Sequence, residues 1–358
     1  MNYRLASLLA AEAITATATK TIDINLANPI SRIVIQVKGM NSTSVPTAHP
    51  AKMVTKIELV DGSDVLLSLS GMEAQALSYY TQGRMPHTVL NYVNNVNAIA
   101  TYELYFGRSL WDTLLAFDPR KFVNPQLKIT HNIAAGGSAP DAGEISVFAD
   151  TFDEKVIAPM GFLMAKEQYS YTLTASKNEH IDLATDRPYR SLMLMALSAG
   201  LMPSSGFDYV KLSEDNDRRV IINNQRGWDL LKLNKMHPRM SELVMVTDID
   251  AETTIYCSPT YETVVVGNGM DASEVTLFQD QSYGGTFDAT AGAAGNVQFL
   301  VNGQNPHGSM ILPFGLQNEI EDWYDVAKVG NLKLTIMAGS DASGTLEIVS
   351  EQLRKYAE

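Results

Sequence analysis

Cysteine is almost absent from this chain of 358 residues, in which Cys257 is the only one. A single thiol cannot form an intrachain disulfide or a cysteine-cluster metal site, so we interpret Cys257 as a buried, inert side chain. Long apolar runs are missing as well. No eighteen consecutive apolar residues occur, and stretches such as 156–165 are too short to cross a bilayer. We therefore expect no membrane-spanning helix.

Positive charge is also scarce. The chain has 27 Lys and Arg against 40 Asp and Glu, which gives a formal net charge of -13. A surface that binds nucleic acid through its phosphates needs clustered basic side chains, so we expect no direct contact with nucleic acid. The remaining composition, 45% apolar and 19% charged, is that of a folded protein, and the length predicts two domains.

Motifs that carry catalytic or metal chemistry are not recognisable. The acidic clusters at 214–217 and 248–250 lack EF-hand spacing, and we interpret them as solvated hairpin turns. No nucleophile elbow, Walker loop or kinase signature occurs. The sequence therefore predicts no catalytic residue, no cofactor and no metal ion. The histidines are scattered and form no metal-binding motif: His49, His87, His131, His180, His237 and His307.

Several sequence segments occur twice along the chain, in the same order. LKIT at 127–130 returns as LKLT at 332–335, and the aromatic-glycine pair Phe106-Gly107 returns as Phe314-Gly315. Five matches in one order indicate an internal duplication. The matching pairs are 22–39 with 180–200, 56–70 with 208–224, 105–117 with 313–330, 127–130 with 332–335, and 141–150 with 341–351.

Each copy has the pattern of β-strands. Leu127 and Ile129 in the first copy, and Leu332 and Leu334 in the second, alternate with polar residues, which is the period of a sheet with one buried face. We place these four side chains in the cores of their copies. Seven or eight strands with one or two short helices describe a sandwich, whose commonest large form is the jelly roll. The predicted fold is all-β with a few short helices, as two tandem jelly-roll β-sandwiches.

Helices are expected in few places. Residues 1–17 predict an N-terminal amphipathic helix with Leu5, Leu8 and Leu9 on one face. Ser70 and Glu73 form a capping-box pattern at the start of a helix over 70–83. Further helices are expected at 226–235, after each aromatic-glycine pair with Trp111 and Trp323 as their anchors, and in the tail 351–358.

The repeat also predicts the domain limits. The first jelly roll spans 18–155, a linker spans 156–178, and the second jelly roll spans 179–358. The second copy is longer by about 52 residues, and the surplus falls in a glycine-rich loop insertion at about 240–310.

This arrangement resembles the double jelly-roll major capsid proteins of tailless icosahedral viruses, the lineage of tectiviruses, corticoviruses and adenoviruses. The resemblance covers roughly residues 18–350 and rests on the two β-rich copies, each with a Phe-Gly turn before the LKIT or LKLT strand. It implies a structural protein of the virion shell, of a bacteriophage for example, without enzymatic activity. Such a protein would be assembled in the host cytoplasm.

The resemblance also implies partners. Three two-sandwich chains present six similar blocks, so a homotrimeric, pseudo-hexameric capsomer is expected, in contact with neighbouring capsomers and other virion proteins. The N-terminal helix would lie at the inner rim. There Arg4, Leu5, Leu8 and Leu9 would face a neighbouring capsomer or, in a virus that has one, an internal lipid membrane. The loops of the insertion would point outward.

Two other functions stay open. A glycan-processing hydrolase on two sandwiches would place convergent carboxylates in a cleft between the domains. A carbohydrate-binding or adhesive protein of a phage would show exposed aromatic side chains on one sheet face. The repeat favours the capsid hypothesis, because strands rather than polar residues match between the copies.

Overall fold

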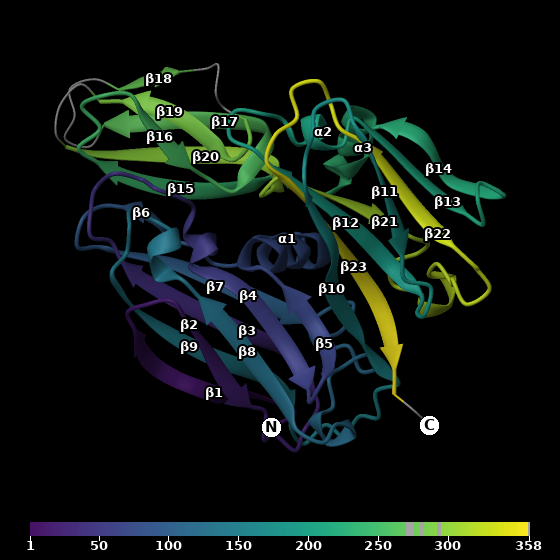
Figure 1. Cartoon of the computed structure of the whole chain (residues 1–358). Coiled ribbons are helices and arrows are strands. Elements are labelled where there is room, and N and C mark those ends of the chain that lie inside the picture. Colours follow the sequence, from purple (N-terminus) through teal and green to yellow (C-terminus); the bar gives the residue numbers. More distant parts are fainter. Residues whose placement is uncertain (270–274, 279–282, 292–294, 357–358) are drawn as a thin grey trace.

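The computed structural model describes residues 1–269, 275–278, 283–291 and 295–356 (Figure 1). In these residues the chain forms three β-rich units. Two are large sandwiches that lie side by side, and the third is a smaller unit that stands above the first sandwich in the view of Figure 1.

The first sandwich consists of two four-stranded sheets, with strand orders β1-β9-β3-β7 and β2-β8-β4-β5. Strands that follow one another from β1 to β4 alternate between the two sheets, which is the connectivity of a jelly roll. The strands are β1 (Tyr3–Ile14), β2 (Ala18–Asp23), β3 (Ile30–Met40), β4 (Val54–Asp61), β5 (Asp64–Leu69), β7 (Asn97–Tyr105), β8 (Pro125–His131) and β9 (Ala142–Phe152).

The second sandwich repeats this connectivity with strand orders β10-β23-β12-β21 and β11-β22-β13-β14. Here β10 takes the place of β1, β12 that of β3, and β23 that of β9. The prediction of two tandem jelly rolls is confirmed. The strands are β10 (Gly161–Thr172), β11 (Asn178–Leu183), β12 (Tyr189–Leu197), β13 (Tyr209–Glu214), β14 (Arg219–Arg226), β21 (Ser309–Pro313), β22 (Leu332–Met337) and β23 (Thr345–Lys355).

The sequence repeat corresponds to equivalent strands. LKIT lies on β8 and LKLT on β22, which hold the same position in the two sandwiches. Leu127 and Ile129 are fully buried in the first core, and Leu332 and Leu334 are 1% and 0% exposed in the second. The intervening lysines and threonines face outward, so the period of two in the sequence follows the two faces of each sheet.

The insertion of the second copy is a folded unit rather than a set of loops. It lies between α3 (Gly227–Leu233) and β21 and, together with β6 from the first copy, forms the sheets β17-β20-β15-β6 and β16-β19-β18 around a core that includes Val244, Phe287 and Phe299. Residues 270–274, 279–282 and 292–294 of the predicted glycine-rich region lie outside the described residues. The first copy contributes β6 (Leu90–Tyr92), which precedes β7. The strands of the insertion are β15 (Met240–Thr247), β16 (Thr253–Tyr256), β17 (Pro259–Gly269), β18 (Thr276–Phe278), β19 (Thr286–Thr290) and β20 (Asn296–Pro306).

The predicted N-terminal helix is wrong, because β1 is a strand that pairs with β9 throughout its length. Alanine and leucine favour a helix in isolation, but the open edge of β9 offers hydrogen bonds that a lone helix would leave unused. Two register shifts in β1 place Leu8 and Leu9 partly against the core, while Leu5 is 62% exposed. The predicted linker over 156–178 is also wrong. Gly161–Thr172 forms the strand β10, which pairs with β23.

The helices predicted after the aromatic-glycine pairs are also wrong. Trp111 has a φ of +66°, which interrupts any helix, and Asp112 accepts hydrogen bonds from the backbone N–H groups of Arg108 and Leu114 at 3.1 and 3.0 Å. Ser109, with Asp112 three residues on, has the spacing of a helix start but marks a side-chain-capped turn here. After Phe314, only the short η6 (Ile320–Asp322) forms. The tail is part of β23 rather than a helix up to Lys355, and residues 357–358 lie outside the described part of the chain.

Two predicted helices are confirmed. The first is α1 (Gly71–Gln82), which begins with the capping box of Ser70 and Glu73 and ends at Gly83 with a φ of +70°. The second is α3, at the predicted 226–235 region. The other short elements are α2 (Pro203–Gly206), η1 (Pro50–Met53), η2 (Pro119–Lys121), η3 (Ile133–Ala135) and η4 (Asn234–Met236).

The placement of Leu332 in the second core can be tested with the substitution Leu332→Asp. The substitution should lower the free energy of unfolding by roughly 4 kcal/mol or more, because a carboxylate without a partner would enter the second core. The matched control is Lys333→Gln on the outward face of the same strand, with an expected change of about 0.5 kcal/mol or less. Thermal and denaturant unfolding measure both. Equal stability of the two variants would contradict the placement of Leu332.

Candidate functional site: the junction of the sandwiches and the pocket beside it

The two sandwiches share one continuous sheet. The edge strand β5 of the first lies parallel to the edge strand β10 of the second, with Ser68 opposite Lys166. The result is an eight-stranded sheet, β2-β8-β4-β5-β10-β23-β12-β21, that runs through both sandwiches. The junction therefore joins unlike ends, since the β5 side of one sandwich meets the β10 side of the other.

The outward face of the β10-β23-β12-β21 sheet is buried by α1 of the first sandwich. Along β12, Leu192 and Leu194 belong to the second core, whereas the alternate residues Met193 and Met195 belong to the cluster that contains α1. Every residue from Tyr189 to Ala196 is buried as a consequence. This sheet is thus covered on both faces, and the junction is an apolar interface rather than a flexible linker.

A second apolar cluster strengthens the junction. Trp323 is 3% exposed and packs with Leu115 of the first sandwich and with Leu163 and Leu353 of the second. Its predicted equivalent, Trp111, has a different environment, because its ring lies 4.2 Å from that of Tyr3 on β1 (centroid to centroid). The two tryptophans occur at matching places in the sequence but do not anchor helices.

An ion pair is enclosed at the same junction. The Arg190 guanidinium donates to both carboxylate oxygens of Glu351 at 3.1 and 3.0 Å, and Ser191 donates to the same carboxylate at 3.1 Å. The charged side chains are 7% and 4% exposed. The loss of hydration of both charges offsets much of their attraction, so we expect this pair to fix the relative position of β12 and β23 rather than to add much net stability.

Two carboxyl groups lie close together at α1: Glu73 of the helix is fully buried, and Glu347 of β23 is partly buried. Burial and the neighbouring Glu347 raise the pKa of Glu73 to about 8, against the opposing effect of the Ser70 hydrogen bonds. Burial and Glu167 raise the pKa of Glu347 to about 7, and Lys52 lowers it. Both acids therefore bind protons more tightly in the folded protein than in the unfolded chain.

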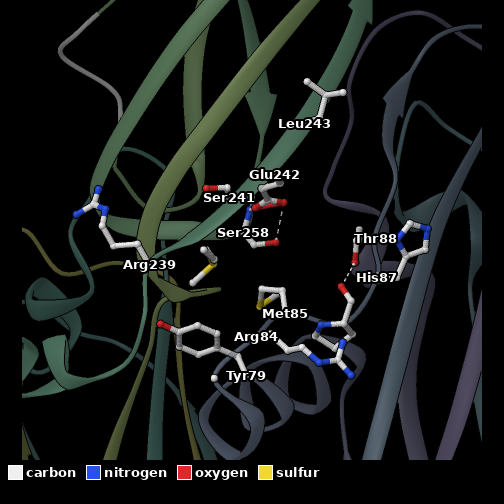
Figure 2. A pocket seen from close by; sticks show the side chains of 13 residues that line it. Tyr79, Arg84, Met85, His87, Thr88, Arg239, Ser241, Glu242, Leu243 and Ser258 are labelled. Carbon is white, nitrogen blue, oxygen red and sulfur yellow. Dashed lines mark hydrogen bonds between the residues drawn. The ribbon is translucent and has the colours of Figure 1, made fainter.

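A polar pocket of about 380 Å³ lies where the insertion meets the first sandwich (Figure 2). The loop after α1 contributes Arg84 and His87, and the start of the insertion contributes Arg239 and Glu242. In Figure 2 the side chains of Glu242 and Ser258 point toward one another, and burial raises the pKa of Glu242 to about 7.

The serine in this pocket is not arranged as a nucleophile. The backbone N–H of Ala51 donates to Nδ1 of His49 at 3.0 Å, so the proton of this neutral imidazole is on Nε2. Nε2 lies 3.0 Å from Oγ of Ser258, which in turn donates to Glu242 at 3.1 Å. His49 therefore donates a hydrogen bond to Ser258, and Ser258 donates one to Glu242. In a nucleophilic serine the direction is the reverse, because the hydroxyl donates to the histidine that will accept its proton. Burial holds the pKa of His49 well below its ordinary value.

The hydrogen bonds around His49 and Ser258 belong to a network that connects the insertion to the first sandwich. His307, from the turn between β20 and β21, lies 2.9 Å from Oε1 of Gln75 on α1 and 4.8 Å from His49 between ring centroids. Tyr92 of β6 donates to the backbone carbonyl of Tyr256 at 2.8 Å. Sequence reasoning missed these contacts, because His49 and Ser258 are 209 residues apart and belong to no motif.

Metal-binding geometry is not found among the described residues, which contain no group of three or more His, Cys, Asp and Glu suited to hold an ion. The acidic cluster at 214–217 forms the β13–β14 turn, where Asp215 and Asp217 have positive φ values. Asp215 accepts hydrogen bonds from the backbone of Gly330 and Asn331, and Asp217 pairs with Lys211.

The raised pKa values of Glu73 and Glu347 predict a pH dependence of stability. Because the pKa values of Glu73 and Glu347 lie above the ordinary value of 4.5, their contribution to stability is lost as the pH rises from about 4.5 to about 8. Glu73→Gln keeps an acceptor for the capping box and should raise the melting temperature at pH 8 by about 2 °C or more, with a smaller change at pH 5. The exposed Glu154→Gln is the control. A gain that is equal at both pH values would contradict the assignment.

No protein-family model matches this sequence. No curated protein sequence matches it either.

Solved structures, in contrast, resemble the chain over its whole length. The major capsid protein of bacteriophage PM2 has a TM-score of 0.58 at 9% identity, covering 99% of this chain and 98% of that chain. The major capsid protein of Sulfolobus turreted icosahedral virus has a TM-score of 0.60 at 14% identity, covering 99% and 97%. VP54 of PBCV-1 has a TM-score of 0.57 at 11% identity, covering 98% and 94%. The chain has the double jelly-roll fold of these major capsid proteins.

Proposed function

We propose that this chain is a major capsid protein, the structural subunit of an icosahedral virus shell. The observation that carries the proposal is that two jelly rolls of matching connectivity, joined by a buried junction, fill the chain from Tyr3 to Lys355. The three capsid proteins compared above share this fold over at least 94% of their length. The protein would be located in the virion shell after assembly in the host cytoplasm.

The second part of the proposal is a homotrimer with a pseudo-hexameric outline. Contacts between unlike ends generate closed rings when the rotation per contact divides a full turn. The junction within the chain is a contact of this kind, since the β5 side of the first sandwich meets the β10 side of the second. Three chains that repeat it would supply six blocks. Neighbouring capsomers and other virion proteins would be the further partners, and direct contact with nucleic acid is not proposed.

A lipid contact at the N-terminus is not part of the proposal, because the helix on which that prediction rested is the strand β1. No helix in the described part of the chain is long and apolar enough to cross a membrane. Arg4 lies 3.8 Å from Asp153 (Nε to Oδ1), within the first sandwich.

The two alternative functions have less support. A hydrolase needs convergent carboxylates in the cleft, whereas the pocket of Figure 2 is lined by the single acid Glu242 beside a serine that donates to it. A sugar-binding sheet face needs exposed aromatic side chains. Trp228 is 40% exposed but lies on α3, and Trp323 is buried. Tyr169 on β10 is 39% exposed, but its hydroxyl donates to Glu179 at 3.1 Å.

The proposed assembly can be tested by measuring the mass of the purified chain. Light scattering after size exclusion should give a species of three times 39.2 kDa, and electron microscopy should show a hexagonal outline. A homogeneous monomer at micromolar concentration would contradict the trimer.

A further inference from the structure

Two helices hold the same position in the two sandwiches but differ in exposure. Both α1 and α3 follow the fifth strand of their jelly roll, β5 and β14, and precede the next strand of the opposite sheet, β7 and β21. In α1 every residue from Gly71 to Tyr80 is buried. On α3 and the η4 turn that follows it, Trp228, Leu233 and Met236 are 40%, 69% and 78% exposed.

The difference has a physical cause in the chain itself. The helix α1 is buried because the outward face of the β10-β23-β12-β21 sheet packs on it at the junction. The equivalent sheet of the first sandwich, β1-β9-β3-β7, has an outward face that α3 of the same chain cannot reach. In Figure 1, β1 and α3 lie at opposite corners of the molecule.

Strand register identifies the equivalent positions on these two sheet faces. In the first sandwich Leu5 pairs with Asp150, which pairs with Arg32. In the second sandwich Ala165 pairs with Glu351, which pairs with Ser191. Leu5 therefore holds the position of Ala165, which contacts the groove beside α1.

Exposure differs sharply between these equivalent positions. Ala165 is 4% exposed and Leu5 is 62% exposed. The next cross-strand pair on the same face is Met193 and Val349 in the second sandwich, and each is 1% exposed. The equivalent pair in the first sandwich, Val34 and Phe148, is only partly buried. The first sandwich thus presents the partly exposed apolar side chains of Leu5, Val34 and Phe148, interspersed with polar ones, in the place where the second sandwich is covered by a helix.

We propose that the α3 face of one chain docks on the outward face of the β1-β9-β3-β7 sheet of a second copy. The α3 face is defined by Trp228, Leu233, Met236 and the adjoining apolar groove of about 350 Å³, which Ile222 and Phe314 also line. This proposal rests on the homotrimer proposed above and names its contact. The contact reproduces between chains the packing of α1 on the second sandwich.

Charge favours the same partner. Residues 218–239 contain six basic side chains and one acidic side chain, in a chain whose net charge is -13. All six basic side chains, from Arg218 to Arg239, are exposed. Four of them pair with three carboxylates of the same chain, Glu214, Asp229 and Glu262, so an excess of positive charge remains. A basic surface on an otherwise acidic protein is attracted to another copy of that protein, and the attraction weakens as salt screens it.

The first test disrupts the α3 face. Leu233→Glu combined with Met236→Glu should convert the trimer to monomer, with at least a tenfold weaker association by light scattering across a dilution series. The matched control is Val266→Glu, a 60% exposed apolar residue on β17 of the insertion, which should leave the trimer intact. Circular dichroism and melting temperature establish that both variants are folded, as expected for substitutions of exposed residues.

The possible results distinguish a failure of the proposed α3 contact from a failure of the proposed trimer. A wild-type trimer that persists in the double variant would overturn the α3 contact and leave the proposed trimer standing. A wild-type monomer would overturn both. Intact trimers that no longer form particles would place the α3 face between capsomers and overturn the contact proposed here. Retention of nucleic acid by the wild type, lost in the double variant while the trimer persists, would assign the basic surface to nucleic acid instead.

The second test identifies the opposite face. Met236→Cys in one tagged preparation and Leu5→Cys in another are unfolded, mixed, refolded together and treated with a short bis-maleimide reagent, which Cys257 should not consume because it is 3% exposed. A crosslinked product that carries both tags is expected. Replacement of Met236→Cys by Val266→Cys should abolish it. Equal crosslinking from both positions would refute the pairing of α3 with β1.

Discussion

The β10-β23-β12-β21 sheet must be buried on both faces, and the rest of the molecule follows from this constraint. A sheet of a β-sandwich normally has one face in water. Here Met193 and Met195 make the outer face apolar, and only the first sandwich with its helix α1 can cover it. The two jelly rolls are consequently held in one relative position, which the parallel pairing of β5 with β10 and the enclosed pair of Arg190 and Glu351 specify further.

The insertion depends on the same junction. Its first strand, β15, pairs with β6 of the first sandwich, and its contacts with that sandwich include His49, Gln75 and Tyr92. These polar groups lie in a region with little water, where an unpaired donor or acceptor is costly, so each hydrogen bond fixes the orientation of the insertion. The polar network that superficially resembles a serine hydrolase site is explained by this structural role.

The internal repeat allowed the double jelly roll to be predicted, because inward residues such as Leu127 and Leu332 alternate in both copies. The first strand of each copy was missed. In β1 the composition favours a helix, and only pairing with the distant β9 decides otherwise. The turns at Trp111 and Trp323 were mistaken for helices because Ser109 with Asp112, and Asn318 with Glu321, have the spacing of a helix start, which a side-chain-capped turn can share. The pocket residues could not be grouped from sequence, since the topology alone brings His49 to Ser258.

The two copies of the sheet differ in a way that suits two kinds of contact. Within the chain the junction never has to separate, so methionine and valine can fill its outer face without a cost in solubility. The equivalent face of the first sandwich carries Arg32, Val34 and Gln36 on β3, a mixture that water can solvate. A chain that must remain soluble before it associates needs such a mixture, because a large exposed apolar patch promotes aggregation. Under the proposed trimer, duplication followed by divergence at these outward positions would yield one permanent contact and one that forms on assembly.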